Sequence, residues 1–211
     1  MFLQIKSTVR VWLVAILLSV FWGNVSKAEE LLIIDNFEGA QSKSQLMIEW
    51  EKYTDSHAGG DSKIEFAINK VPADSTGEDQ PEGHVASLHG HFGDGFSYPF
   101  FGMRTFFKKG GTPVDLSSYK GVWIRLKNEN DFALQLLTAN VTDYNEFSFT
   151  VSSSDEWKTL KIPFSVFEQS AFFGKKVGFS VEKIRGIVVH VTGAPETESE
   201  QIEIDQIAFY G

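Results

Sequence analysis

The sequence predicts an all-β fold, a jelly-roll β-sandwich of about ten strands in a single domain. Short apolar runs alternate with turn-forming clusters of Gly, Asp, Asn, Ser and Pro along most of the chain. Aromatic residues reach 14%, and 19 residues are phenylalanine. After residue 28 no long segment has the spacing of an amphipathic helix. Apolar faces of this kind are buried by packing one sheet on another.

The first 28 residues have the layout of a secretory signal peptide. Lys6 and Arg10 form a positive n-region, an apolar run follows from Val11 to Trp22, and the segment ends at the small residue Ala28. The apolar run is about 12 residues long, whereas a bilayer span needs ~20. We therefore expect cleavage after Ala28 and a secreted or periplasmic protein without a membrane span. An uncleaved membrane anchor is the alternative.

Charge and cysteine content exclude several classes of function. Loss of residues 1–28 would change the net charge from −9 to −12, because that segment holds three basic residues and no acid. So acidic a chain is not expected to bind nucleic acid or anionic lipid, and its ligands should be neutral, cationic or metal-linked. The chain has no cysteine, which excludes disulfides and thiol chemistry. Residues 29–211 are expected to form one monomeric domain.

Ten segments carry the strand pattern and define the predicted elements. In chain order they are Leu31–Phe37, Ile64–Ile68, Val85–His89, Met103–Phe107, Gly121–Lys127, Phe132–Thr138, Glu146–Val151, Trp157–Ile162, Gly186–Val191 and Gln201–Tyr210. Helix is expected only as a turn or two, near Ser165–Gln169 and Val181–Ile184.

Alternation within these strands separates a core face from an outer face. In Gly121–Lys127 the apolar set would point inward, which leaves Trp123 and Arg125 outside. In Phe132–Leu136 the same reasoning leaves Gln135 outside. An outer face that bears Trp, Arg, Gln and Ser suits a sugar, because rings stack on C–H faces while amides and charges bind hydroxyls. The alternative is an ordinary sheet exterior in which a loop covers Trp123.

No catalytic motif stands out, and we expect no enzyme activity. The sequence lacks a Gly-rich phosphate loop, a Gly-x-Ser-x-Gly elbow and a His-Glu-x-x-His motif. His89 and His91 would share one strand face, either as a metal pair or in an ordinary strand role. Two carboxylates can hydrolyse glycosides, but the sequence does not show which acids face each other across a cleft.

Several segments, in order, resemble two related families. Trp50, Asp55, Gly59-Gly60 and Ser62 resemble the Trp…Asp…Gly-Gly-x-Ser signature of the complex I intermediate-associated protein 30 family. Segments that resemble family 11 carbohydrate-binding modules are Asp35–Glu38, Phe101–Thr105, Val114–Gly121, Trp157–Ser165, Phe167–Gln169 and Ile204–Ile207. The resemblance extends from about Leu31 to Gly211, and it implies a galactose-binding-like jelly roll.

This resemblance implies a non-catalytic binding protein. The carbohydrate-binding relatives suggest that a polysaccharide binds on an open sheet face. The alternative is an assembly or scaffold factor that binds a protein partner through an apolar patch, for example Phe96, Tyr98, Phe100 and Phe101. A glycan-active enzyme is a third hypothesis, and it requires two carboxylates about 5–10 Å apart.

The polar and aromatic side chains expected to contact a ligand lie on one sheet face or its rim. They are Tyr53, Asp55, Arg104, Trp123, Arg125, Gln135 and Tyr144. The alternative for Asp55 and Arg104 is an ion pair that fixes the Gly59-Gly60 turn, where both glycines would supply positive φ. Trp50 and Trp157 are expected in the core.

Calcium is the cofactor that the resemblance implies. Related jelly rolls hold a structural calcium where the first and last strands meet, and Asp35, Glu38 and Asp205 occupy the matching motifs here. Carboxylate oxygens are the ligands that calcium prefers. The alternative is that Asp35 and Glu38 cap a turn while Asp205 pairs with a nearby Lys or Arg.

Overall fold

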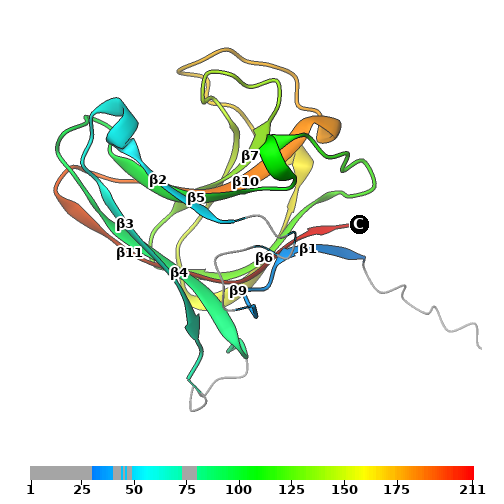
Figure 1. The fold of residues 1–211 in the computed structure, drawn as a ribbon, viewed down its shortest axis with the longest axis horizontal. Coiled ribbons are helices and arrows are strands. Elements are labelled where there is room, and N and C mark those ends of the chain that lie inside the picture. The colour runs from blue at the N-terminus through cyan, green and yellow to red at the C-terminus, as the bar shows by residue number, and fades with distance from the viewer. Residues whose placement is uncertain (1–29, 40–43, 45, 47–48, 73–79) are drawn as a thin grey trace, which may run out of the picture.

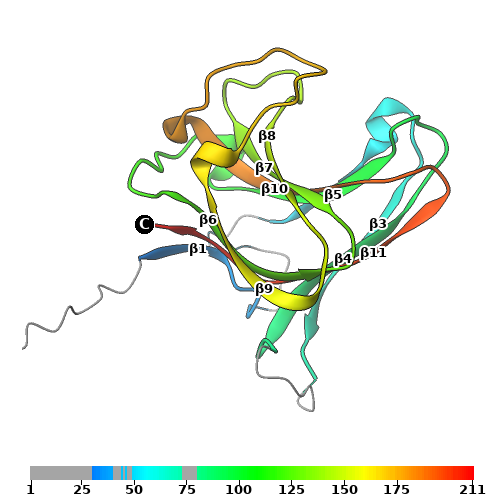
Figure 2. The ribbon, with the colours of Figure 1, turned by 180° about the vertical axis from the view of Figure 1, so that it is seen from behind.

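The computed structural model describes residues 30–39, 44, 46, 49–72 and 80–211. The predicted signal peptide, residues 1–28, lies outside them. Within the described part, eleven strands and four short 3-10 turns occur, and there is no α-helix. The strands form two antiparallel sheets that face each other across one core (Figures 1 and 2). The predicted all-β sandwich is confirmed.

The six-stranded sheet is built around its longest strand, β11 (Thr197–Tyr210). Its other members are β3 (Lys63–Lys70), β4 (His84–Phe92), β6 (Gly121–Asn128), β9 (Ser154–Pro163) and β1 (Leu31–Asp35). The order is β3-β4-β11-β6-β9, and β1 pairs with the last residues of β11, beyond the point where β4 ends its pairing. β11 therefore has a neighbour on each side along most of its length.

The five-stranded sheet covers the other side of the core. Its order is β2 (Glu51–Thr54), β5 (Phe100–Phe106), β10 (Ile184–Thr192), β7 (Phe132–Thr138) and β8 (Phe147–Val151). The 3-10 turns are η1 (Asp55–Ala58), η2 (Lys109–Gly111), η3 (Phe164–Val166) and η4 (Val181–Lys183). In Figure 1, η1 and the connections at the β7–β8 end stand on the side of this sheet away from the core.

All ten predicted strands are present, and β7 has the predicted bounds. The turns η3 and η4 lie where short helical turns were expected. The prediction missed β2, η1 and η2. Among the described residues, no helix has the length and apolarity to cross a membrane.

The core follows the predicted alternation. Val122, Ile124 and Leu126 of β6 are fully buried, as is Leu134 of β7. Each fully buried aliphatic side chain of this size contributes ~1.5–3 kcal/mol to folding, so the two inner faces together hold the sandwich. Trp50 packs in this core with its ring centroid 5.9 Å from that of Phe37, as predicted.

Trp157 is not in the core, which corrects the prediction. It is only half-buried, because it shares its side of β9 with Thr159 and Lys161. Those two residues are register partners of the outward-facing Arg125 and Trp123 of β6. Trp157 therefore lies on the outer face of the six-stranded sheet.

Candidate functional site

Strand register builds a polar row across the outer face of the five-stranded sheet. Successive partners across β2, β5, β10, β7 and β8 are Glu51, Arg104, Val188, Gln135 and Ser148. Their neighbours along each strand point into the core, so these side chains point away from it. We call this surface the five-stranded face.

The next row along the five-stranded face centres on Tyr53 and His190. Their rings are nearly parallel, with a 9° interplanar angle and centroids 6.0 Å apart, and Tyr53 Oη lies 2.7 Å from His190 Nδ1. Between them in the row is Gly102, where a Cβ atom would come within 2.5 Å of the Tyr53 hydroxyl. Glycine at this position lets the tyrosine ring lie flat across the sheet.

Burial keeps both members of this pair neutral. It raises the pKa of the Tyr53 phenol, against a small opposing effect of Arg104, and it lowers the pKa of His190 to about 4. At pH 7 the pair is a neutral phenol and a neutral imidazole. A neutral imidazole can both donate and accept, which is the behaviour that recognition of a hydroxyl group requires.

Arg104 is the fixed cation of the five-stranded face. Its Nε donates to Glu51 Oε2 at 3.0 Å, and its guanidinium lies 5.7 Å from the ring centre of Tyr53 and 5.6 Å from that of Phe106. Ion pairing and the two rings hold the planar guanidinium in one place. The alternative in which Arg104 pairs with Asp55 is wrong, since Glu51 is its partner.

A chain of aromatic rings crosses one end of the five-stranded face. Ring centroids of neighbours are 5.7–6.2 Å apart in the order Tyr98, Phe96, Phe100, His57 and Tyr144. We call this set the aromatic belt. Its two ends are highly exposed, Tyr98 to 78% and Tyr144 to 79%. Tyr144 also adopts φ 64°, a left-handed conformation that costs a non-glycine residue ~1 kcal/mol or more.

Asp55 lies below the surface and shapes the loop that carries His57. It is fully buried, and its carboxylate accepts hydrogen bonds from Ser62 N at 3.1 Å, Ser62 Oγ at 2.6 Å and Phe100 N at 3.3 Å. Gly59 has φ 90°, as predicted, and it ends the unpredicted turn η1. Gly60 does not have positive φ; a Cβ there would come within 2.2 Å of the Asp55 carboxyl carbon. Glycine is therefore required at position 60 because any side chain would collide with Asp55.

Trp123 and Arg125 lie on the other sheet. Both project from the outer face of β6, where Trp123 is the register partner of Ala208 and Lys161, and Arg125 Nη1 donates to Asp205 at 3.2 Å. The predicted ligand residues therefore do not share one face. Tyr53, Arg104 and Gln135 lie together on the five-stranded face with Tyr144 at its border, whereas Asp55 is buried below it.

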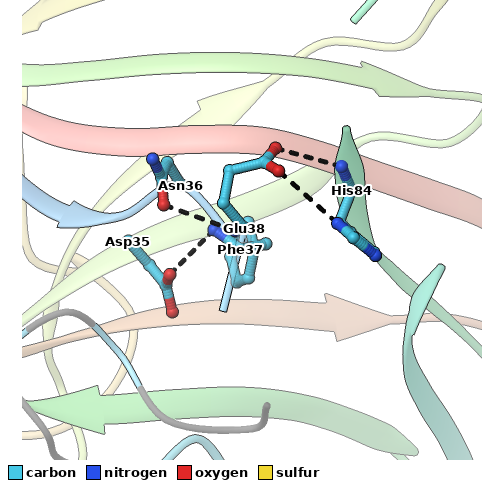
Figure 3. Close-up of polar contacts among 5 residues, drawn as sticks. All are labelled: Asp35, Asn36, Phe37, Glu38 and His84. Carbon is cyan, nitrogen blue, oxygen red and sulfur yellow. Dashed lines mark hydrogen bonds and ion pairs between the residues drawn. The ribbon is translucent and has the colours of Figure 1, made fainter. Parts of the chain in front are cut away.

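The three predicted calcium ligands each have another partner. Asp35 accepts from Trp50 Nε1 at 2.7 Å and from the Phe37 amide at 2.8 Å. Figure 3 shows Glu38 turned toward His84, whose backbone N donates to Oε1 at 3.0 Å and whose Nδ1 lies 3.4 Å from Oε2. Asp205 pairs with Arg125. Asp35 and Asp205 follow the turn-capping and ion-pair alternative, whereas Glu38 binds His84 instead of capping a turn. Calcium remains a sequence-based prediction.

His89 and His91 do share the outer face of β4, but each faces a glutamate. His89 Nε2 lies 3.4 Å from Glu65 Oε2, and His91 Nδ1 lies 3.0 Å from Glu198 Oε1. In the part of the chain that the structure describes, no three acidic or histidine side chains converge on a common point.

The model of the complex I intermediate-associated protein 30 (CIA30) family matches residues 36–204. The chain belongs to the CIA30 family. This confirms the resemblance that the Trp50…Ser62 segment suggested. No curated protein is similar enough to count as a match.

Two solved structures from Clostridium thermocellum are similar in fold to this CIA30-family chain. The family 11 carbohydrate-binding module of cellulosomal cellulase Lic26A-Cel5E gives a TM-score of 0.60 at 18% identity, covering 88% of this chain and 96% of that one. A family 11 module in complex with a β-1,3-1,4-mixed-linked tetrasaccharide gives 0.57 at 19%, covering 87% and 95%. The CIA30-family domain therefore has the predicted carbohydrate-binding-module fold.

Sequence reasoning missed several residues of the site. His190 stands in the run Gly186–Val191, where alternation marks it as the polar residue on the outward side. Phe100 was assigned only to a protein-binding patch, and Phe101 of that patch is buried. Nothing in the sequence pattern indicated His57, because it lies in a 3-10 turn whose position depends on Asp55.

Proposed function

We propose that this CIA30-family protein binds a polysaccharide, without catalysis, on the five-stranded face. The observation that carries the proposal is the aromatic belt beside Arg104 and Gln135 of the polar row and His190 of the next row. Exposed Tyr98 and Tyr144 rings can stack on the C–H faces of sugar rings, while the polar row binds hydroxyl groups. The strained backbone of Tyr144 supports a binding role for that residue.

The wide separation of Glu51 and Glu146 on the five-stranded face supports binding rather than hydrolysis by this pair. Glu51 belongs to β2 at one edge of the sheet, and Glu146 comes just before β8 at the other edge. Four strand spacings separate those edges, about 19 Å. A glycosidase needs its two carboxylates within about 5–10 Å, and Glu51 is held by Arg104.

The test is isothermal titration of the purified protein with soluble β-glucans and other polysaccharides, using two variants. We expect Tyr144→Ala to weaken binding roughly two- to tenfold, because one stacked ring contributes ~0.5–1.5 kcal/mol. Trp123→Ala, on the other sheet, is the matched control and should bind like the wild type. Weaker binding by Trp123→Ala together with unchanged binding by Tyr144→Ala would place the site on the six-stranded sheet. The absence of binding heat with every glycan would reject the proposal.

A protein partner is the second candidate function, and one observation favours it. Phe172 and Phe173 are 97% and 53% exposed on a loop that Asn145 holds by hydrogen bonds to Phe173 O and Ser170 O. Adjacent exposed phenylalanines in a braced loop are unusual outside an interface. An assembly-factor role, of the kind the family's name describes, would use this loop. Phe172→Ser/Phe173→Ser should then abolish partner capture and spare glycan binding.

We also infer that the protein works outside the cytoplasm. The basic n-region and short apolar run of residues 1–28 support this proposal. Intact-mass measurement of protein recovered from the exported fraction should show a chain that begins at Glu29. A full-length mass in the membrane fraction would favour the uncleaved anchor.

A further inference from the structure

Arg185 lies near the start of β10, the central strand of the five-stranded sheet, where the strand pairing is irregular. The pairing of β10 with β7 shifts between Ile184 and Gly186, so Arg185 is the extra residue of a β-bulge. Bulges of this kind redirect a side chain and are common beside binding sites. The flanking residue Gly186 pairs with Phe106 and Leu137 on the five-stranded face.

The Arg185 side chain lacks a complete set of partners. Its Nε is buried without a hydrogen-bond acceptor, and among the described residues no carboxylate forms an ion pair with the guanidinium. Its Cδ lies 4.0 Å from the place where a Cβ atom on Gly111 would stand, beside the Phe106 ring. A buried donor without an acceptor is costly. The Arg185 guanidinium can therefore gain a hydrogen-bond acceptor from a bound ligand.

Glu146 is a carboxyl group on which Arg185 acts electrostatically, although no ion pair joins the two side chains. Burial raises the pKa of Glu146 to about 7, against the opposing effects of the Thr138 amide and of Arg185, and Asp143 raises it further. Part of the Glu146 carboxyl population is therefore protonated at neutral pH. In that form Glu146 can donate a hydrogen bond to an anion instead of repelling it.

We propose that Arg185 and Glu146 form a subsite for an anionic oxygen group on the bound polysaccharide, a uronate carboxylate or a sulfate ester. This inference rests on the proposed function and names the sugar class that the face selects. The guanidinium fork matches either oxyanion through two parallel N–H···O bonds. The net charge, −9 for the full chain and −12 without residues 1–28, opposes anionic ligands at long range, but ~0.15 M salt screens that repulsion beyond ~8 Å while leaving the direct contact.

The experiment compares three soluble ligands at ~0.15 M salt: polygalacturonate, dextran sulfate and a neutral β-glucan. We expect at least one anionic polymer to bind more tightly than the neutral glucan. Arg185→Gln should weaken anionic binding roughly tenfold or more, as expected for loss of a charge-assisted pair, and should change neutral binding less than about twofold. Tighter binding of polygalacturonate alone would identify the carboxylate as the ligand group. Tighter binding of dextran sulfate alone would identify the sulfate.

Lys183→Gln is the matched control, because it removes one positive charge from an exposed residue two positions earlier. It should leave all affinities unchanged, which separates a contact from a net-charge effect. Arg185→Lys keeps the charge and loses the fork, so it provides a second test if Arg185→Gln unfolds; we expect severalfold weaker anionic binding. Anionic affinity should also fall from pH 6 to pH 8, and this dependence should be absent in Glu146→Gln.

Two results would overturn the inference. If neutral and anionic glycans bind equally and Arg185→Gln changes neither, the subsite is refuted while the proposed function stands. If no polysaccharide binds at all, both fail together. Folding of each variant is checked by far-UV circular dichroism and thermal melting before titration.

Discussion

At the scale of single residues, the buried Asp55 and the half-buried Glu146 have different roles. Asp55 accepts three hydrogen bonds and fixes a loop, whereas Glu146 has an amide donor at 3.4 Å and a raised pKa. Burial that few hydrogen-bond donors offset raises the pKa of Glu146. Sequence reasoning selected Asp55 from a motif, but it had no means of counting the donors that the fold brings around it.

Asp55→Ala is expected to lower the free energy of unfolding by about 3 kcal/mol or more. The substitution would leave Ser62 N, Ser62 Oγ and Phe100 N without their acceptor, and each buried unsatisfied donor costs ~1–3 kcal/mol. Urea unfolding followed by tryptophan fluorescence measures the change. Asp94→Ala, an exposed residue near the aromatic belt, serves as the control. A loss as small as that of Asp94→Ala would contradict the structural role of Asp55.

Glu146 should make stability depend on pH. In the unfolded chain its carboxyl titrates near ~4.3, and in the folded chain near 7. Between those values the folded protein keeps a proton that the unfolded chain loses, so the stabilisation is complete below pH ~4.3 and is lost as pH rises through about 7. At ~1.4 kcal/mol per pKa unit the shift corresponds to ~4 kcal/mol, and solvent screening of the partly exposed side chain reduces this to about 2–3 kcal/mol.

Glu146→Gln removes this titration. Relative to wild type, the variant should gain about 2–3 kcal/mol on going from pH 4 to pH 8 in urea unfolding. The exposed Glu156→Gln should show no such difference between the two pH values. An equal effect of Glu146→Gln at both pH values would show that the folded pKa is not raised.

At the scale of elements, alternation predicted the strands and their inner faces, but not which sheet each strand joins. The inward and outward residues of β6 and β7 were assigned correctly from a period of two. Trp123 on β6 and Gln135 on β7 were nevertheless placed on one face, because register across strands depends on long-range pairing. β2 was missed because Glu51 and Lys52 at this sheet edge are both exposed, so the strand lacks a clear apolar alternation.

One buried residue should control the order of the loop at residues 170–177. Asn145 donates to Ser170 O and Phe173 O and accepts from Ser170 N. Asn145→Ala should therefore loosen this loop, and trypsin should cut after Lys175 or Lys176 at least several times faster than in wild type. Limited proteolysis with mass spectrometry measures the rate. The exposed Asn69→Ala should leave it unchanged, and equal rates in both variants would show that other contacts brace the loop.

At the scale of the whole molecule, the fold was predictable because composition, strand spacing and motif order all indicate one architecture. The position of the binding surface was not. Its central pair, Tyr53 and His190, lies 137 positions apart in the sequence and meets only through β5. The hydrophobic pattern of a segment gives information about residues that are close in sequence. A site assembled from five strands contains few residues that are close in sequence, so the pattern did not predict it.

Whole-molecule stability also tests the calcium prediction. A structural ion at a thousand times its Kd would add ~4 kcal/mol, which for a domain of this size raises Tm by roughly 8–16 °C. The partners of Asp35, Glu38 and Asp205 in the structure lead us to expect a Tm shift of less than ~2 °C between calcium and chelator. A rise in Tm that Asp205→Asn abolishes would establish the ion at the predicted ligands.

The place of β11 also determines when the protein can fold. This strand of 14 residues lies between β4 and β6 and also pairs with β1. The six-stranded sheet therefore lacks its central strand until residues 197–210 have been synthesised. On the ribosome, pairs such as β3–β4 and β6–β9 can form early, but the six-stranded sheet cannot be completed, because the partners of β1 lie more than 170 positions downstream. Folding is thus postponed to the end of the domain's synthesis. During that interval the chain is open to chaperones, proteases and transport machinery alike.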